Sequence, residues 1–148
     1  MARVDYIDDP AAPSANSVVP SVVAAVVNER SEMLMVHRAD NDLWALPGGG
    51  HDIGEFIADT VVREVREETG IQAEIEASLG ETRYFYVWEE VRIRKTVHFF
   101  LMRATGGDPD DRDDEMEDVR WFPLERALKR AAYRGEREVL GRAAEHLR

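Results

Sequence analysis

Cysteine is absent from the 148 residues of the chain. This absence excludes disulfide bonds, thiolate metal sites and a cysteine nucleophile. A chain without disulfides is suited to a reducing compartment, and we expect a cytoplasmic protein.

Basic residues are scarce relative to acidic ones. The chain has 19 Lys and Arg against 30 Asp and Glu, which gives a formal net charge of −11. Such a charge disfavours binding of a nucleic-acid backbone across a broad basic surface. A nucleotide held through a metal ion is compatible with it, so we expect a small-molecule partner and no nucleic acid.

Long apolar runs are also lacking. The apolar run 18–27 contains Pro20 and is far shorter than the roughly 20 residues that a membrane helix needs. We therefore expect no membrane partner and interpret this run as a buried strand. Residues 1–16 contain prolines and aspartates but no apolar signal-peptide core. We predict a loose amino-terminal arm over 1–16 and one domain over 17–148.

The spacing of apolar residues predicts alternating strands and helices. Two valine-rich or apolar stretches flank the polar turn 28–31 and predict a hairpin. Strands are expected at 22–27, 33–37, 73–75, 83–88, 96–102 and 119–122, and helices at 58–70, 124–132 and 136–147. This order indicates one α/β or α+β domain with a mixed sheet covered by helices.

Three glutamates mark the first predicted helix. Glu64, Glu67 and Glu68 lie at i, i+3 and i+4 and point the same way. They repel one another by roughly 0.2–0.5 kcal/mol per pair, near the negative end of the helix dipole. Mg²⁺ or Mn²⁺ would turn this repulsion into coordination, because both ions take hard oxygen ligands and leave positions for water and phosphate. The alternative is a solvated acidic helix face.

A glycine-rich segment precedes this helix and completes a pattern of fixed spacing. The positions that carry it are Gly49, Glu55, Arg63, Glu64, Glu67, Glu68 and Gly70, followed by the aliphatic Ile71. This pattern resembles the box of the Nudix, or MutT-like, hydrolase family in full, and 44–49 and 121–124 are similar to the segments that flank it. So many restricted positions make a chance match improbable. The resemblance covers about residues 18 to 148.

The resemblance implies a Nudix fold, which is an α/β/α sandwich with a central mixed β-sheet. It implies an enzyme that uses Mg²⁺ or Mn²⁺ to hydrolyse a nucleoside diphosphate linked to another moiety. The implied metal ligands are the carbonyl of Gly48 and the carboxylates of Glu64, Glu67 and Glu68. Glu55 and Arg63 would brace the loop against the helix. A homodimer is one assembly that the resemblance allows.

One carboxylate must also accept a proton during hydrolysis. Neighbouring carboxylates raise the pKa of a glutamate toward the working range. The catalytic candidates are Glu68, Glu64 beside it, and Glu115 in the acidic loop 108–118. Further alternatives in that loop are Asp113, Asp114 and Glu117, and a merely solvated loop is the other interpretation.

Substrate contacts are expected from the glycine-rich segment and from the later strands. The candidates are Trp44, Gly49, Gly50, His51, Arg83, Tyr84, Tyr86 and His98. Aromatic residues at alternating strand positions are more often packing residues, so packing is the alternative for the tryptophan and the tyrosines.

We rank a nucleoside tri- or polyphosphate first as substrate. A dinucleoside polyphosphate comes second, because Tyr86 lies near a tyrosine position of such enzymes. ADP-ribose or another nucleotide sugar comes third. The alternative to an enzyme is a non-catalytic nucleotide-sensing domain, which the intact set of box glutamates disfavours.

Overall fold

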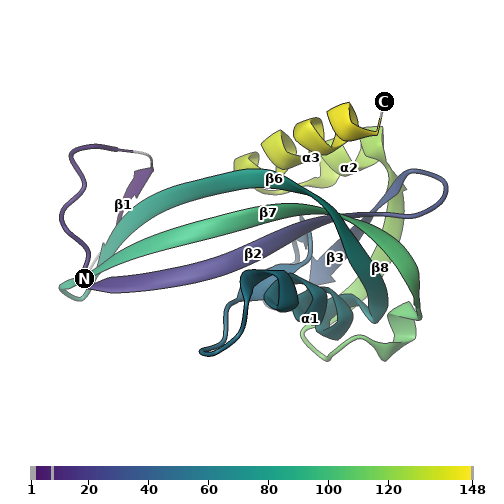
Figure 1. Ribbon diagram of the computed structural model, residues 1–148, viewed down its shortest axis with the longest axis horizontal. Helices are drawn as coiled ribbons and strands as arrows, with labels where there is room; N and C mark the ends of the chain where they lie inside the picture. The colour runs from purple at the N-terminus through teal and green to yellow at the C-terminus, as the bar shows by residue number, and fades with distance from the viewer. Residues whose placement is uncertain (1–2, 8, 148) are drawn as a thin grey trace.

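The described strands form one mixed β-sheet with helices on both faces, as Figure 1 shows for the computed structural model. The structure describes residues 3–7 and 9–147. In chain order the elements are β1 (Val4–Ile7), β2 (Ser17–Val27), β3 (Glu32–Arg38), β4 (Trp44–Ala45), β5 (Gly48–Gly50), α1 (Ile57–Thr69), β6 (Ile71–Trp88), β7 (Val91–Gly107), the 3₁₀ helix η1 (Pro109–Asp111), β8 (Met116–Pro123), α2 (Leu124–Arg130) and α3 (Arg134–His146). The predicted α/β/α sandwich is confirmed.

The strand order of the sheet is β1-β6-β7-β2-β3-β4, with β5 paired to β2 and β8 paired to β3. The β2–β7 pair is parallel, from Ser17 opposite Ile93 to Val27 opposite Arg103. The other described pairs are antiparallel, which makes the sheet mixed. The predicted hairpin of β2 and β3 is confirmed.

Strand β2 separates two hydrophobic cores. Val22, Ala24 and Val26 pack with Val61 and Val65 of α1 on one face of the sheet. On the other face, alternate residues of β2 pack with α2 and α3, and this second core includes Ala25, Val27, Ala127, Val139, Leu140 and Ala143. Successive side chains of a strand point to opposite faces, so a strand covered on both faces is apolar throughout. The run predicted to be a buried strand is such a strand at its carboxyl-terminal end, where residues 24–27 are fully buried, whereas Val18 at its start is 56% exposed.

Helix α1 ends at Gly70, as the sequence predicts. Gly70 has φ 74°, and its N–H donates to the Arg66 carbonyl at 2.8 Å. A Cβ at this position would collide with the backbone carbonyl oxygen of Asp108. Gly70 is therefore required both for the left-handed end of the helix and for the close approach of the acidic loop.

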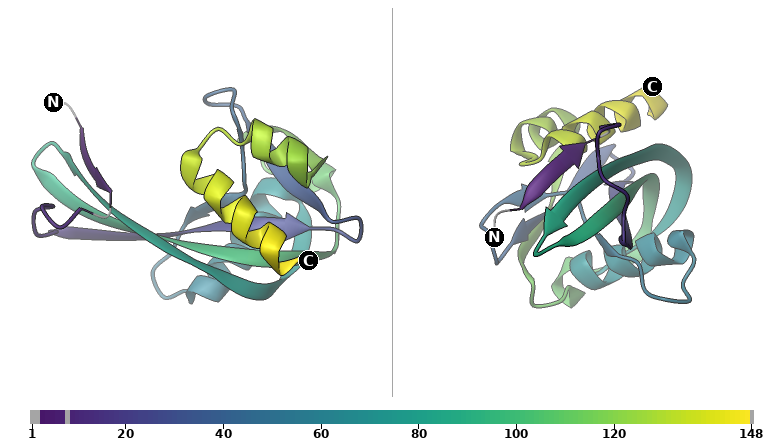
Figure 2. Two further views of the ribbon diagram at one scale, coloured as in Figure 1. Left: turned by 90° about the horizontal axis from the view of Figure 1, so that it is seen from above. Right: turned by 90° about the vertical axis from the view of Figure 1, so that its left-hand side faces the viewer.

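The strands predicted at 73–75 and 83–88 belong to one long strand, β6. The separation was wrong, because the intervening polar residues also pair with β7, for example Glu81 opposite His98. Register shifts near Ala73, Ala77 and Ser78 accommodate the strong curvature of β6 seen in Figure 2.

The amino-terminal arm contains a strand that the sequence does not predict. Residues 4–7 form β1, which pairs with β6 from Val4 opposite Val87 to Ile7 opposite Tyr84. The arm is therefore not loose over these residues, because its backbone pairs with β6, a strand distant in sequence. Together with the adjoining ends of β2, β6 and β7, this strand projects beyond the helices (Figures 1 and 2). Met1, Ala2 and Asp8 lie outside the described residues.

The Gly70→Ala variant tests the helix end. We expect the free energy of unfolding to fall by about 1–3 kcal/mol, because alanine is strained at positive φ and its Cβ meets Asp108. The matched control is Gly141→Ala within α3, where a Cβ would meet no atom within 4 Å. The control should gain about 0.5–1 kcal/mol. Urea denaturation measures both, and a Gly70→Ala protein as stable as wild type would contradict the prediction.

Candidate active site

The three box glutamates extend from the core to the surface along α1. Glu68 is 5% exposed, while the side chain of Glu67 is 48% exposed and Glu64 lies between these extremes. The packing of α1 sets these exposures, because the buried Val61 and Val65 fix the rotation of the helix against the sheet. The carboxylates of Glu64 and Glu68 consequently lie beside β5.

Glu68 contacts the glycine-rich segment directly. Its Oε2 accepts a hydrogen bond from the Gly48 N–H at 3.0 Å. Burial raises the pKa of Glu68 to about 8, and the nearby charges of Glu64 and Asp113 add to this rise. The Gly48 hydrogen bond and Arg38 oppose it. A carboxyl group with a pKa near neutrality is suited to accept a proton.

Arg63 ties the loop and the acidic residues together. Its guanidinium donates to both oxygens of Glu55, at 2.7 and 3.0 Å, and to the Gly50 carbonyl at 3.1 Å. Its Nη1 also donates to Glu64 at 3.0 Å and to Glu67 at 3.2 Å. Arg63 and Thr60 lower the pKa of Glu55 to about 2. The structure thus brings the predicted bracing pair, Glu55 and Arg63, into contact.

The glycines of β5 allow the backbone to lie against the helix. A Cβ on Gly49 would collide with the Glu64 carboxylate, and one on Gly48 would collide with the Val22 carbonyl oxygen. The absence of side chains at these glycines therefore lets the β5 backbone lie directly against the Glu64 carboxylate and β2. This donor set fits a hard divalent cation such as Mg²⁺ or Mn²⁺.

Backbone bonds fix the glycine-rich segment in place. The Pro47 carbonyl accepts from Ala24 N at 2.9 Å, and His51 N donates to the Pro20 carbonyl at 3.1 Å. Between these two points β5 pairs with residues 21–23 of β2. The His51 ring contacts the Glu55 carbonyl oxygen, so any contact of His51 with phosphate stays a prediction.

The acidic loop docks on the carboxyl-terminal end of α1. Asp108 N donates to the Gly70 carbonyl at 3.1 Å, and Asp113 N donates to the Glu67 carbonyl at 2.8 Å. Asp113 is also close enough to Glu68 to raise its pKa. Of the loop acids that the sequence suggests, Asp113 is thus the one with a clear electrostatic link to Glu68.

Glu115 lies farther along the loop, with an exposed side chain. It borders an open hollow of about 360 Å³ together with Arg38, Ala39 and Asp40. The catalytic role of Glu115 therefore stays a prediction. Arg38, which sequence reasoning missed, binds both oxygens of Asp40 at 3.0 Å and acts electrostatically on Glu68. No motif signals Arg38, because strand pairing alone brings it here.

The strand candidates divide between the two faces of the sheet. Tyr84 pairs with Lys95, which by alternation shares a face with Val97 and the core under α2 and α3. Tyr84 and Tyr86 therefore lie on the face opposite the box glutamates, and their contact with substrate stays a prediction. Their rings pack together at 6.0 Å between centroids, and Arg3 lies over Tyr86.

The side chains of the substrate candidates Trp44, Arg83 and His98 pack against or pair with other side chains of the protein. The Trp44 ring stacks on His37 with 5.0 Å between ring centroids and meets Phe122 edge-on with 5.1 Å between centroids, as the packing alternative predicts. Arg83 and His98 lie on the α1 face but both pair with Glu81, at 3.1 and 3.3 Å. Their contact with substrate stays a prediction.

A second acidic group lies away from the box. Within the described residues, His37, Asp42 and Glu117 form a group whose ligand atoms all lie within 4.8 Å of one another. The two ring nitrogens of His37 face Asp42 at 2.6 Å and Glu117 at 3.2 Å. Each nitrogen already has a carboxylate partner, so we interpret this group as a histidine bridging two acids.

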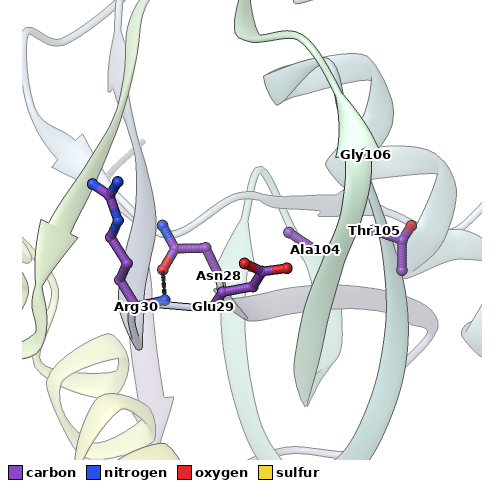
Figure 3. Close-up of a pocket in the computed structure, with 6 residues that line it drawn as sticks. All are labelled: Asn28, Glu29, Arg30, Ala104, Thr105 and Gly106. Carbon is purple, nitrogen blue, oxygen red and sulfur yellow. Dashed lines mark hydrogen bonds between the residues drawn. The ribbon is translucent and has the colours of Figure 1, made fainter.

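A further open hollow, of about 330 Å³, lies where the β2–β3 turn meets the end of β7 (Figure 3). It is lined by Asn28, Glu29, Arg30, Ala104, Thr105 and Gly106. Asn28 Oδ1 accepts from Arg30 N at 2.9 Å and from Glu32 N at 3.0 Å. The Asn28 side chain therefore shapes the turn. The lining of the hollow includes none of the candidate site residues.

The family model described as NUDIX domain matches residues 18–142 of the chain. The chain belongs to the Nudix family. Among its relatives, a putative mutator protein MutT4 of Mycobacterium tuberculosis is 42% identical over 104 residues, covering 70% of this Nudix chain and 42% of that protein. A putative 8-oxo-dGTP diphosphatase of Bacillus subtilis is 35% identical over 96 residues, covering 65% of this chain and 60% of that protein. The matched part is thus about two to three fifths of these relatives.

The fold agrees with solved Nudix structures. An ADP-ribose pyrophosphatase from Streptococcus suis superposes with a TM-score of 0.67 at 27% identity, covering 88% of this chain and 92% of that chain. Within the described residues, no helix of this Nudix chain is long and apolar enough to cross a membrane.

The raised pKa of Glu68 predicts how the stability of the metal-free protein depends on pH. Because this pKa rises from 4.5 to about 8 on folding, the folded state binds more protons between these values. The free energy of unfolding therefore falls as pH rises through this window. Glu136, whose pKa also rises to about 8, acts in the same direction. Glu55 acts oppositely, but only below 4.5.

Calorimetric melting temperatures of the chelator-treated protein between about pH 5 and pH 8 test this dependence. We expect the melting temperature of Glu68→Gln to fall less with rising pH than that of wild type, since glutamine does not titrate. Glu138 is exposed on α3, and the melting temperature of Glu138→Gln should fall with rising pH as much as that of wild type. Identical slopes for wild type and Glu68→Gln would contradict the assignment.

Proposed function

We propose that the chain is a metal-dependent hydrolase of a pyrophosphate bond in a nucleoside diphosphate linked to another moiety. The observation that carries this proposal is the assembly of the complete box around one point. Glu68 binds Gly48 and Glu64 lies against Gly49. Arg63 connects Glu64 and Glu67 to Glu55. Membership of the Nudix family supports the same reaction class.

The proposed ligands are the Gly48 carbonyl and the carboxylates of Glu64, Glu67 and Glu68. An Mg²⁺ or Mn²⁺ ion bound by them would neutralise the phosphate oxygens, lower the pKa of a bound water and align attacker and leaving group. Arg63 now shares its Nη1 between Glu64 and Glu67, which keeps these two acids together before the ion arrives.

Glu68 is our first candidate for the base. Its Oε2 is held by Gly48 N, so Oε1 is the oxygen that we assign to take the proton from the attacking water. Burial and the neighbouring acids keep its proton affinity high, and the same hydrogen bond fixes the carboxylate relative to the proposed metal position. Asp113, which lies near enough to influence Glu68, is the acid of the loop that we rank next.

For the substrate we propose a nucleoside tri- or polyphosphate. The likeness to the putative 8-oxo-dGTP diphosphatase of Bacillus subtilis supports an oxidised purine nucleoside triphosphate as the first compound to test. Dinucleoside polyphosphates come second. ADP-ribose comes third, with the Streptococcus structure in its favour.

The Glu68→Gln variant tests the proposal. We expect turnover to fall by about 10²–10⁴-fold, because the variant loses the proton acceptor, while the exposed Glu138→Gln control keeps wild-type turnover. The measurement is a chromatographic screen of nucleoside triphosphates, dinucleoside polyphosphates and nucleotide sugars, with Mg²⁺, Mn²⁺ or a chelator. Product identity assigns the bond that breaks.

Two outcomes would contradict the proposal. Wild-type turnover of Glu68→Gln at saturating Mg²⁺ would remove Glu68 from the mechanism. Tight nucleotide binding without turnover across the panel would instead favour a sensing domain.

A further inference from the structure

Two buried carboxyl groups from opposite helical layers hold the segment Leu46–Gly48. On one side, Glu68 of α1 accepts from Gly48 N at 3.0 Å. On the other, Glu136 of α3 accepts from Leu46 N at 3.1 Å through Oε1. The first contact belongs to the box, whereas the second comes from a helix that contributes no box residue.

Glu136 occupies an unusual place for an acid. It is 8% exposed and shares the buried face of α3 with Val139, Leu140 and Ala143. Its Oε2 is buried and has no hydrogen-bond partner within the described part of the chain. Burial raises the pKa of Glu136 to about 8, which favours the neutral acid at neutral pH. A neutral carboxyl group can still accept the Leu46 hydrogen bond through its carbonyl oxygen.

An apolar residue would pack at this position without the cost of burying an acid. It would, however, leave the buried Leu46 N–H without a partner, which costs roughly 1–3 kcal/mol. The sequence contains a signal for this role that the box does not include: Glu136 continues the apolar i, i+3, i+4, i+7 pattern of 139, 140 and 143.

The hydrogen bond from Leu46 N to Glu136 lies only two residues before Gly48 in the chain. A single residue, Pro47, separates them, and its ring restricts φ. The Pro47 carbonyl is also bound to Ala24 N at 2.9 Å. With so little freedom between them, a shift of Leu46 would change where the Gly48 carbonyl points.

We propose that Glu136 is a positioning residue for the metal site, because its hydrogen bond to Leu46 N fixes the segment that presents the Gly48 carbonyl. The inference rests on the proposed function, in which that carbonyl is a metal ligand. Removing a partner that orients a metal ligand typically lowers metal affinity by about 10–100-fold.

The test compares Glu136→Met, which fills the space but cannot accept an N–H bond well, with Glu136→Gln, which keeps an acceptor oxygen. Calorimetry measures Mn²⁺ affinity, and NMR measures hydrogen exchange at the Leu46 amide, on protein shown to be folded by circular dichroism. We expect Glu136→Met to bind Mn²⁺ about tenfold more weakly or worse, with faster Leu46 exchange. Glu136→Gln should match wild type in both.

Two controls separate positioning from general loss of stability. Val139→Ala lies on the same buried face of α3 and should destabilise the core while keeping Mn²⁺ affinity. Glu138→Met changes an exposed acid that pairs with Arg134 and should change neither readout.

Wild-type Mn²⁺ affinity in folded Glu136→Met would overturn the inference, as would equal weakening in Val139→Ala. If Glu136→Met does not fold, Glu136→Gln decides. Retained affinity and Leu46 protection would support the acceptor role, and their loss would overturn it. A wild-type protein that binds no divalent ion would instead remove the metal set of the proposed function, which is a separate result.

Discussion

The candidate site depends on one guanidinium group. Three acids and the glycine-rich loop surround one cation, the guanidinium of Arg63, which donates to Glu55, Glu64, Glu67 and the Gly50 carbonyl. Because Arg63 lies on the same helix as Glu64 and Glu67, the formation of α1 brings these two acids and their counter-charge together.

The two helical layers have different relations to this loop. Helix α1 brings the acids of the box, while α3 reaches through the opposite core to hold Leu46. Between them, residues 24–27 of β2 are buried, with alternate side chains in the two cores. Residues from both helical layers and from the sheet therefore build the site, and the hydrogen bond from Leu46 to Glu136 lies two residues from the proposed ligand Gly48.

Local parts of this arrangement were predictable from sequence, and parts that depend on distant pairing were not. The helix with its three glutamates and the end at Gly70 follow from short-range spacing. Strand β1 was missed because its pairing with β6 spans most of the chain. The face taken by Tyr84 depends on register, and the link of Asp113 to Glu68 depends on how the loop docks, which composition does not encode.

The projecting part of the sheet separates the tryptophans. Trp88, at the end of β6, is 46% exposed. Trp44 and Trp121 pack in the body on either side of the sheet. These are the 3 tryptophans of the chain. A quencher dissolved in water should therefore reach Trp88 in the projection more readily than the partly buried Trp44 and Trp121 near the helices. The protein thus contains its own optical reporters for two regions.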